Sequence, residues 1–341
     1  MSLKKIIAAA LVAVVSITTV FITEPYQVSA KNTKKTISVS YPDVAFNDEE
    51  MKVSVVYSDV FFTKSTVKRQ DSLALLSAAA ADTAYNEKDI KSFMKACGFS
   101  NSRQSVSDEA YNNLSFNFGK KKIGKKTVVA VVLEGTSTSE EWRSNLNLGT
   151  GTIHEGFNTT EKAVHKKLNS YIKKNKLKKG SMVFWVTGHS RGAAVADIMA
   201  KRLSDTYGKN AVYAYTFAAP KVTKSRDKDT SRYTNIYNYI NPDDLVTTLP
   251  PENSDDLAKT LGQLGLLDSD TLSSILISNL YQEFGTYRRY GTDIVMSDSD
   301  HNLMAQTFSD ITGSDFDDTS VEHNHCQSCY LSWLMGCRAY S

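Results

Sequence analysis

The sequence carries little net charge, no internal repeat and no long low-complexity linker. Its 40 Lys and Arg residues nearly balance its 37 Asp and Glu residues, which leaves +3 at pH 7. The lysine-rich stretches at 120–126 and 173–179 flank apolar segments, as solvated loops do, whereas a nucleic-acid binder concentrates its cations on one face. Nucleic acid is therefore not an expected partner. One α/β domain would bury a full core in a chain of 341 residues, so no second domain is required.

Cysteine is scarce as well, with four residues: Cys97, Cys326, Cys329 and Cys337. An even number in an exported chain permits two disulfides, in any of three pairings. The segment from His323 to Cys329 resembles a cluster of metal ligands, but it lacks the second CxxC or His pair that would favour zinc. Disulfides or buried thiols are the favoured interpretation, and neither a metal nor a cofactor is expected.

An uncharged apolar run occupies residues 6–22, behind Lys4 and Lys5, and the small residues Val28-Ser29-Ala30 follow it. A membrane anchor is the alternative, because the run is at the low edge of spanning length. The small residues and the polar stretch after them favour a signal peptide over residues 1–30, cleaved after Ala30. We therefore expect a secreted protein.

Apolar, β-branched runs alternate with helical patterns along most of the chain. A helix is predicted over 71–96, with Gly98 as its cap, and residues 31–70 resemble a polar leader with some alternating Val and Tyr. Further along, the patterns predict strands at 127–133, 182–187, 212–218, 233–240 and 292–296, and helices at 158–175 and 193–207. Strands separated by helices predict the α/β class, with a mainly parallel central sheet and helices on both faces.

The segment Gly188-His189-Ser190-Arg191-Gly192 fits the pattern G-x-S-x-G. It directly follows one predicted strand and opens the next predicted helix, which is the setting that a nucleophile elbow needs. Glycines on both sides allow a strained turn, and the helix N-terminus favours negative charge developing beside Ser190. The alternative is a turn serine that caps the helix without chemistry. We predict Ser190 as the nucleophile.

A serine nucleophile needs a base, and the base needs a carboxylate that orients it. In this architecture both follow the serine in the chain, which leaves three histidines: His301, His323 and His325. His301 is favoured because it lies in a polar loop after the last predicted strand, whereas the other two lie beside cysteines in a polar tail. For the acid, the residues alone do not choose between Asp243 and Asp244, which follow the predicted strand 233–240.

Over residues 71–310 the chain resembles the class 3, or fungal-type, lipase family of α/β-hydrolases and its bacterial relatives. The resemblance depends on an ordered set of motifs: Gly135-Thr136 with Trp142, His154-Glu155-Gly156-Phe157, the elbow, Thr216-Phe217-Ala218-Ala219-Pro220 and the segment Asp244 to Pro250. With the signal peptide it indicates a bacterial, secreted member. It implies one catalytic domain over residues 31–341.

The resemblance implies a role for each matching position. Asp244 falls where the family has its catalytic acid, and His301, in Asp-His-x-x-Met, falls where it has its histidine. Thr136 occupies the oxyanion-hole position, where its backbone amide would act with that of Arg191. Departures from the family pattern are Glu134 for an arginine, Ala218 for a glycine and Thr247 for a proline.

Two segments are candidates for a lid over the site. The family carries its lid in the segment that corresponds to 137–148, which is fairly polar here. Residues 252–286 contain two apolar stripes and are a candidate helical cap insertion. The alternative interpretation of this segment is a pair of helices packed on the core. The expected reaction is acyl transfer to water on a lipid or other carboxylic ester, at a lipid–water interface if the cap opens there. A phospholipase, a short-chain carboxylesterase and a non-catalytic surface-binding module are the alternatives. No stable protein partner is implied.

Overall fold

The computed structural model describes residues 34–106, 114–135, 149, 151–250 and 286–339. Its centre is a seven-stranded sheet in the order β3-β4-β5-β6-β7-β8-β9. The strands span β3 Ser102–Val106, β4 Leu114–Ile123, β5 Lys126–Leu133, β6 Met182–His189, β7 Val212–Phe217, β8 Ile236–Ile240 and β9 Thr292–Val295. The first three pair antiparallel, and β5 to β9 are parallel to one another.

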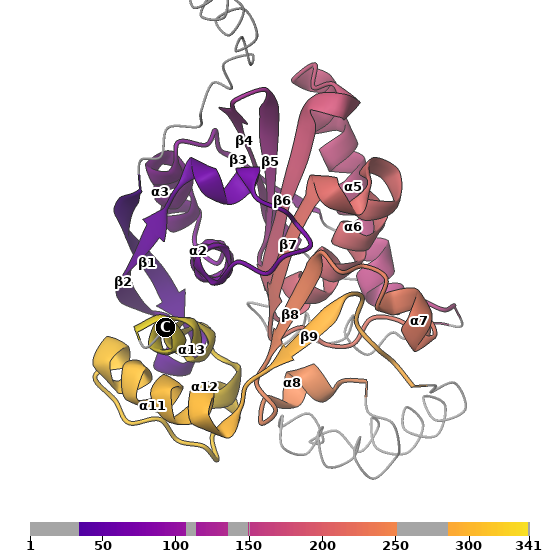
Figure 1. Ribbon diagram of the computed structural model, residues 1–341. Helices are drawn as coiled ribbons and strands as arrows, with labels where there is room; N and C mark the ends of the chain where they lie inside the picture. The colour runs from indigo at the N-terminus through magenta and orange to yellow at the C-terminus, as the bar shows by residue number, and fades with distance from the viewer. Residues whose placement is uncertain (1–33, 107–113, 136–148, 150, 251–285, 340–341) are drawn as a thin grey trace, which may run out of the picture.

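Helices cover both faces of this sheet (Figure 1). The longer ones are α2 Asp71–Thr83, α3 Glu87–Cys97, α5 Glu155–Lys174, α6 Arg191–Tyr207, α11 Asp298–Thr312 and α13 Gln327–Ala339. Short helices are α7 Asp227–Thr230, α8 Leu245–Thr248 and α12 Val321–His325, with 3-10 turns η1 Val44–Phe46, η2 Asp59–Thr63, η4 Lys179–Ser181 and η5 Lys209–Ala211. The parallel sheet between helical layers confirms the predicted α/β-hydrolase fold.

The core has two halves, one on each side of the sheet, because side chains of a strand point alternately to opposite faces. In β5, Val128, Ala130 and Val132 join the half that contains α2, α3 and α13, and the residues between them join the half that contains α5 and α6. The central strands are buried on both faces. This burial explains their continuous apolar runs in the sequence.

Residues 35–57, part of the predicted polar leader, form a two-stranded antiparallel sheet of β1 Lys35–Asp43 and β2 Glu49–Tyr57. Alternate residues such as Tyr41 and Val55 are buried in the same core half as α2. The predicted helix over 71–96 is two helices, because the chain turns at 84–86 and Asn86 caps α3. Gly98 ends α3 with a φ of 77°, as predicted for its cap.

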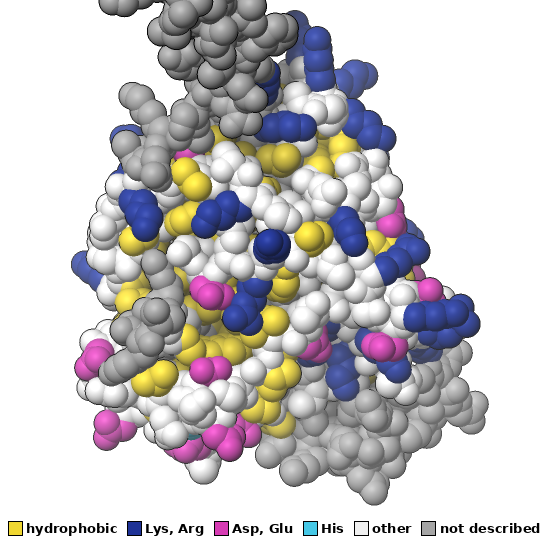
Figure 2. Space-filling view, in the orientation of Figure 1, with side chains coloured by type: hydrophobic (Ala, Val, Ile, Leu, Met, Phe, Trp, Pro, Cys, Tyr) yellow, Lys and Arg dark blue, Asp and Glu magenta, His cyan; other side chains and the backbone are white. Residues whose placement is uncertain are grey.

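Charge is distributed unevenly over the face shown in Figure 2. Lys and Arg side chains gather over its upper and right parts, whereas Asp and Glu gather at the lower left, over α11. None of the described helices is long and apolar enough to span a membrane.

Candidate active site

Ser190 lies at a sharp turn between β6 and α6, with φ 56° and ψ −128°. A β-carbon on Gly188 would lie 2.5 Å from the carbonyl oxygen of Gly192, and one on Gly192 would lie 2.3 Å from that of Glu134. The two glycines therefore allow backbone segments to approach more closely than any side chain permits. The strained conformation at Ser190 is the one expected of a nucleophile elbow, whose serine oxygen projects above the sheet.

The hydroxyl of Ser190 lies 2.8 Å from Nε2 of His325. On the other side of the imidazole, Nδ1 lies 2.9 Å from Oδ2 and 3.0 Å from Oδ1 of Asp244. The three side chains thus form one hydrogen-bonded series from hydroxyl to imidazole to carboxylate. This geometry lets the imidazole accept the serine proton while the carboxylate stabilises the resulting positive charge.

Asp244 is fully buried and accepts hydrogen bonds from several directions. As the N-cap of α8, its Oδ1 accepts from the amide of Val246 at 2.9 Å, and its Oδ2 accepts from the hydroxyl of Tyr330 at 2.8 Å. Bonds of this kind offset the cost of burying a carboxylate. Asp243, the other candidate acid, points elsewhere: it lines a hollow beside His301. Between the two adjacent residues, the structure brings Asp244 to the histidine.

The prediction that His301 is the base is wrong in this structure. His301 lies in the first turn of α11, where its Nε2 is 3.1 Å from a carboxylate oxygen of Asp318. It lines a hollow of about 360 Å³ with Asp243 and Asp298, among other residues, and neither Ser190 nor Asp244 borders this hollow. The chain continues through α11 and returns in α12, which contacts α8 and places His325 beside Asp244. A contact between such distant parts of the chain leaves no trace in local spacing.

The turn that carries His325 is held by the N-terminal strands. Oδ2 of Asp43, at the end of β1, accepts from the amide of Ser328 at 2.8 Å, and Tyr41 forms a 2.8 Å hydrogen bond with the hydroxyl of the same serine. Both bonds hold the first turn of α13, directly after His325. One feature of the sequence did indicate that the C-terminal segment packs on the core: the helix after His325 contains apolar residues such as Tyr330 and Leu334, which are buried.

The oxyanion prediction lies partly outside the described residues, because Thr136 and the candidate lid segment 137–148 are not described. Arg191 is the first residue of α6, directly after Ser190. Amides in the first turn of a helix have no intrahelical acceptor, which suits them to bind a developing anion. Glu134, two residues before Thr136, is buried and pairs with Arg103 at 2.6 Å. The second candidate cover, 252–286, also lies almost wholly outside the described residues.

The cysteines are all free thiols, and Cys97, Cys326 and Cys329 are buried. Burial raises the pKa of Cys97 to about 12 and that of Cys326 and Cys329 well above the usual range, so these thiols stay protonated. Within the described part of the chain, no group of three or more His, Cys, Asp and Glu side chains is arranged to hold a metal ion.

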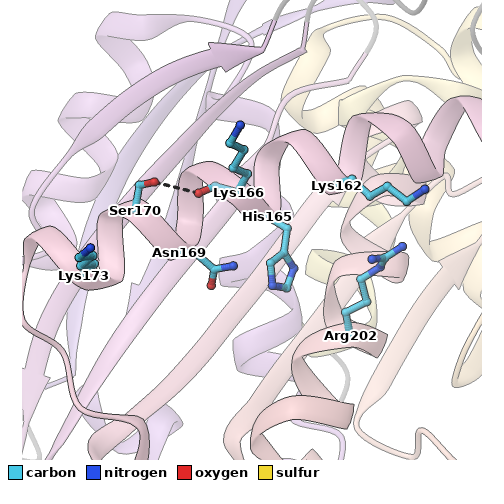
Figure 3. A pocket seen from close by; sticks show the side chains of 7 residues that line it. All are labelled: Lys162, His165, Lys166, Asn169, Ser170, Lys173 and Arg202. Atoms are coloured by element: carbon cyan, nitrogen blue, oxygen red, sulfur yellow. Dashed lines mark hydrogen bonds between the residues drawn. The ribbon is translucent and has the colours of Figure 1, made fainter.

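A separate hollow of about 410 Å³ lies between α5 and α6 and is lined by Lys162, His165, Lys166, Asn169, Ser170, Lys173 and Arg202 (Figure 3). Beneath it the buried Glu161 pairs with Arg202 at 2.8 Å and with His165 at 3.0 Å. None of the three residues of the Ser190 series lines it. The chemistry that the sequence predicts therefore belongs to the site at Ser190.

Comparison with protein families gives one match: the model of the class 3 lipases matches residues 119–254, which include Ser190 and Asp244 but not His325. A search of curated protein sequences gives no match.

Among solved structures, the triacylglyceride lipase of Rhizomucor miehei is 19% identical, covering 53% of this chain and 74% of that one with a TM-score of 0.42. A lipase from Rhizopus microsporus var. chinensis is 17% identical, with 52% and 68% covered and a TM-score of 0.42. The mono- and diacylglycerol lipase of Aspergillus oryzae is 20% identical, with 54% and 75% covered and a TM-score of 0.41.

Proposed function

We propose that this chain is a secreted serine hydrolase of the class 3 lipase type that cleaves carboxylic esters of lipids. The observation that carries the proposal is the unbroken series Ser190–His325–Asp244, with 2.8 Å and 2.9 Å between its members. It is supported by the class 3 lipase model over 119–254 and by the strained elbow at Ser190. The predicted signal peptide over residues 1–30 supports secretion.

In the proposed reaction, Ser190 attacks the ester carbonyl while Nε2 of His325 takes the serine proton. Asp244 holds the imidazole in the tautomer with hydrogen on Nδ1 and stabilises the imidazolium. The imidazolium then donates its proton to the leaving alcohol, which leaves an acyl group on Ser190. Water, activated by the same histidine, hydrolyses that acyl-enzyme. By the family resemblance, the amides of Thr136 and Arg191 would bind the oxyanion.

Hydrolysis of p-nitrophenyl esters with acyl chains from two to sixteen carbons tests the proposal, with wild type compared against Ser190→Ala. We expect the variant to lose about 10⁶-fold in kcat. A preference for long chains would support a lipase, and a preference for short chains would indicate a carboxylesterase instead. If wild type and variant showed the same residual rate at every chain length, the hydrolase proposal would be wrong and a non-catalytic binding module would replace it.

The lipid–water interface is the second part of the proposal. The rate on a long-chain ester is followed as its concentration passes through micellisation. A steep rise above that point would support action at an interface, because surface-active hydrolases gain substrate access there. A smooth saturation curve through the same concentration would contradict it, without bearing on the role of Ser190.

A further inference from the structure

His189, the residue before the nucleophile, lies between two partners. Its Nε2 is 2.9 Å from the backbone carbonyl of His325, and its Nδ1 is 2.9 Å from the hydroxyl of Tyr85. A carbonyl oxygen only accepts hydrogen bonds, so Nε2 must carry the hydrogen and donate it. In a neutral ring Nδ1 is then the acceptor, and Tyr85 must be the donor. The geometry therefore fixes one direction for both bonds.

The surroundings keep the ring of His189 neutral. The side chain is almost fully buried, and burial, together with the nearby His325, lowers its pKa well below the usual range. The two imidazole rings lie 5.0 Å apart between centroids. A positive charge on His189 would therefore oppose the imidazolium that His325 must become during the reaction. A neutral His189 can donate to the His325 backbone without that repulsion.

The carbonyl that His189 binds belongs to the last residue of α12, a helix of only five residues. Carbonyls in the last turn of a helix have no partner within the helix, so they take one from elsewhere or from water. Here the donor comes from the residue next to Ser190. The bond therefore connects the backbone that carries the base directly to the backbone that carries the nucleophile, independently of the 2.8 Å contact between their side chains.

Tyr85 extends this connection to a third part of the site. A β-carbon on Gly135 would lie 1.8 Å from the Tyr85 hydroxyl oxygen, so this hydroxyl packs directly against the backbone that precedes Thr136. Arg103 holds the same two segments together, because it donates to the carbonyl of Ala84 at 2.7 Å and pairs with Glu134. Tyr85 thus contacts both the elbow residue His189 and the start of the segment that the family resemblance assigns to the oxyanion hole.

We propose that Tyr85 and His189 are positioning residues of this site, which hold the His325 turn and the Gly135 segment in register with Ser190. This role rests on the proposed serine hydrolase function. Neither residue touches the reacting atoms; each acts through the backbone that it binds. Tyr85 and His325 both lie outside the region that the class 3 lipase model matches, so the assignment comes from the contacts alone.

A matched pair of amide variants tests the role of His189. Glutamine places an amide N–H near the position of Nε2, within reach of the His325 carbonyl, whereas asparagine reaches only as far as Nδ1. We expect His189→Gln to keep kcat within about threefold of wild type and His189→Asn to lower kcat about tenfold, the effect of one lost hydrogen bond of about 1.4 kcal/mol. KM should change less than twofold in both, because substrate binding is not altered.

Tyr85→Phe provides a second test that does not alter the elbow itself. It removes the donor to Nδ1, the same bond that His189→Gln loses, and should lower kcat no more than about threefold with KM unchanged. Tyr213→Phe is the control: it also removes a tyrosine hydrogen bond, to the carbonyl of Lys64 at 2.6 Å, on a strand that carries none of the three residues of the series. It should lower the melting temperature but leave kcat as in wild type.

The outcomes separate this role from the proposed function. If wild type hydrolyses no ester, the hydrolase proposal and the positioning role are both wrong. If wild type is active but His189→Asn equals His189→Gln and Tyr85→Phe equals Tyr213→Phe in kcat, only the positioning role is overturned. Circular dichroism and melting temperatures show whether each variant folds, and should His189→Asn not fold, the comparison between the two tyrosine variants decides.

Discussion

Tyr330 donates a 2.8 Å hydrogen bond to Oδ2 of Asp244, the same oxygen that lies 2.9 Å from Nδ1 of His325. Burial and the nearby carboxylate raise the pKa of Tyr330 well above the usual range, so its hydroxyl keeps its proton at neutral pH and can donate. Tyr330 follows His325 by five residues in the chain. The C-terminal segment therefore supplies both the histidine and a second hydrogen bond that holds its carboxylate partner.

Tyr330→Phe removes one of the hydrogen bonds that position Asp244 and should weaken the interaction between Asp244 and His325. A hydrogen bond to a charged group contributes about 1.5–3 kcal/mol, so we expect kcat to fall at least about tenfold and the melting temperature to decrease. Steady-state kinetics on a soluble ester gives the first quantity and calorimetry the second. Tyr239→Phe is the matched control, because the Tyr239 hydroxyl is buried and has no hydrogen-bond partner within the described residues. If both variants lost equal activity, the bond to Asp244 would have no special role.

The identity of the base is decided by comparing two histidine variants. His325→Ala removes the imidazole that contacts Ser190 and should lower kcat by about 10⁵- to 10⁶-fold. His301→Ala removes a 3.1 Å contact with the largely exposed Asp318 and an edge contact with the ring of Phe316, and should leave kcat within about twofold of wild type, since exposed pairs contribute little. The reverse result, with His301→Ala inactive and His325→Ala active, would restore the assignment made from sequence.

Adjacent carboxylates allow an equally sharp comparison. Asp244→Asn keeps an acceptor for the Val246 amide but removes the charge that stabilises the imidazolium, so a loss of about 10⁴-fold in kcat is expected. Asp243→Asn alters a side chain in the hollow beside His301 and should change kcat less than threefold. Pre-steady-state acylation rates give the cleanest readout. Equal effects of the two substitutions would show that local charge, rather than contact with His325, matters.

Sequence patterns predicted the central layers of the fold because their signals are local. The strand prediction at 182–187 and the helix prediction at 193–207 each came within two residues of β6 and α6, since a continuous apolar run and a 3.6-residue period reflect burial directly. Gly188 and Gly192 marked the elbow for the same reason. A β-carbon at either position would lie 2.5 Å or less from a backbone carbonyl oxygen, so both positions require glycine.

His325 was not predicted because its position depends on contacts between distant segments. After β9 the chain forms α11, then α12, which carries His325, and then α13, which packs on α11. The distance of a residue from a strand in the sequence carries no information about this path. The N-terminal residues show the same effect. Tyr41 and Asp43 looked like parts of a polar leader, yet both bind Ser328, next to the His325 turn.

The buried Asp197 predicts a dependence of stability on pH. It lies in α6, where Oδ2 accepts from the amide of Tyr290 at 3.0 Å and Oδ1 has no hydrogen-bond partner within the described residues. Burial raises its pKa in the folded protein well above the ordinary value of 3.8. Between pH 3.8 and the raised pKa of the folded protein, the folded state therefore binds more protons than the unfolded state. The stability that this group contributes is fully present below pH 3.8 and is lost as pH rises through the folded pKa.

Asp197→Asn should remove this loss, because an amide is neutral at every pH and can still accept from Tyr290. Urea unfolding measured from pH 4 to pH 8 should give a midpoint for the variant that exceeds that of wild type by an amount that grows with pH, with an unchanged m value. Asp310→Asn, at an exposed position of α11, controls for the removal of one negative charge, and its difference from wild type should not grow in this way. If the Asp197 variant were less stable than wild type at pH 8, ionised Asp197 would be a net stabilising partner of Arg289 instead, and burial would not dominate its environment.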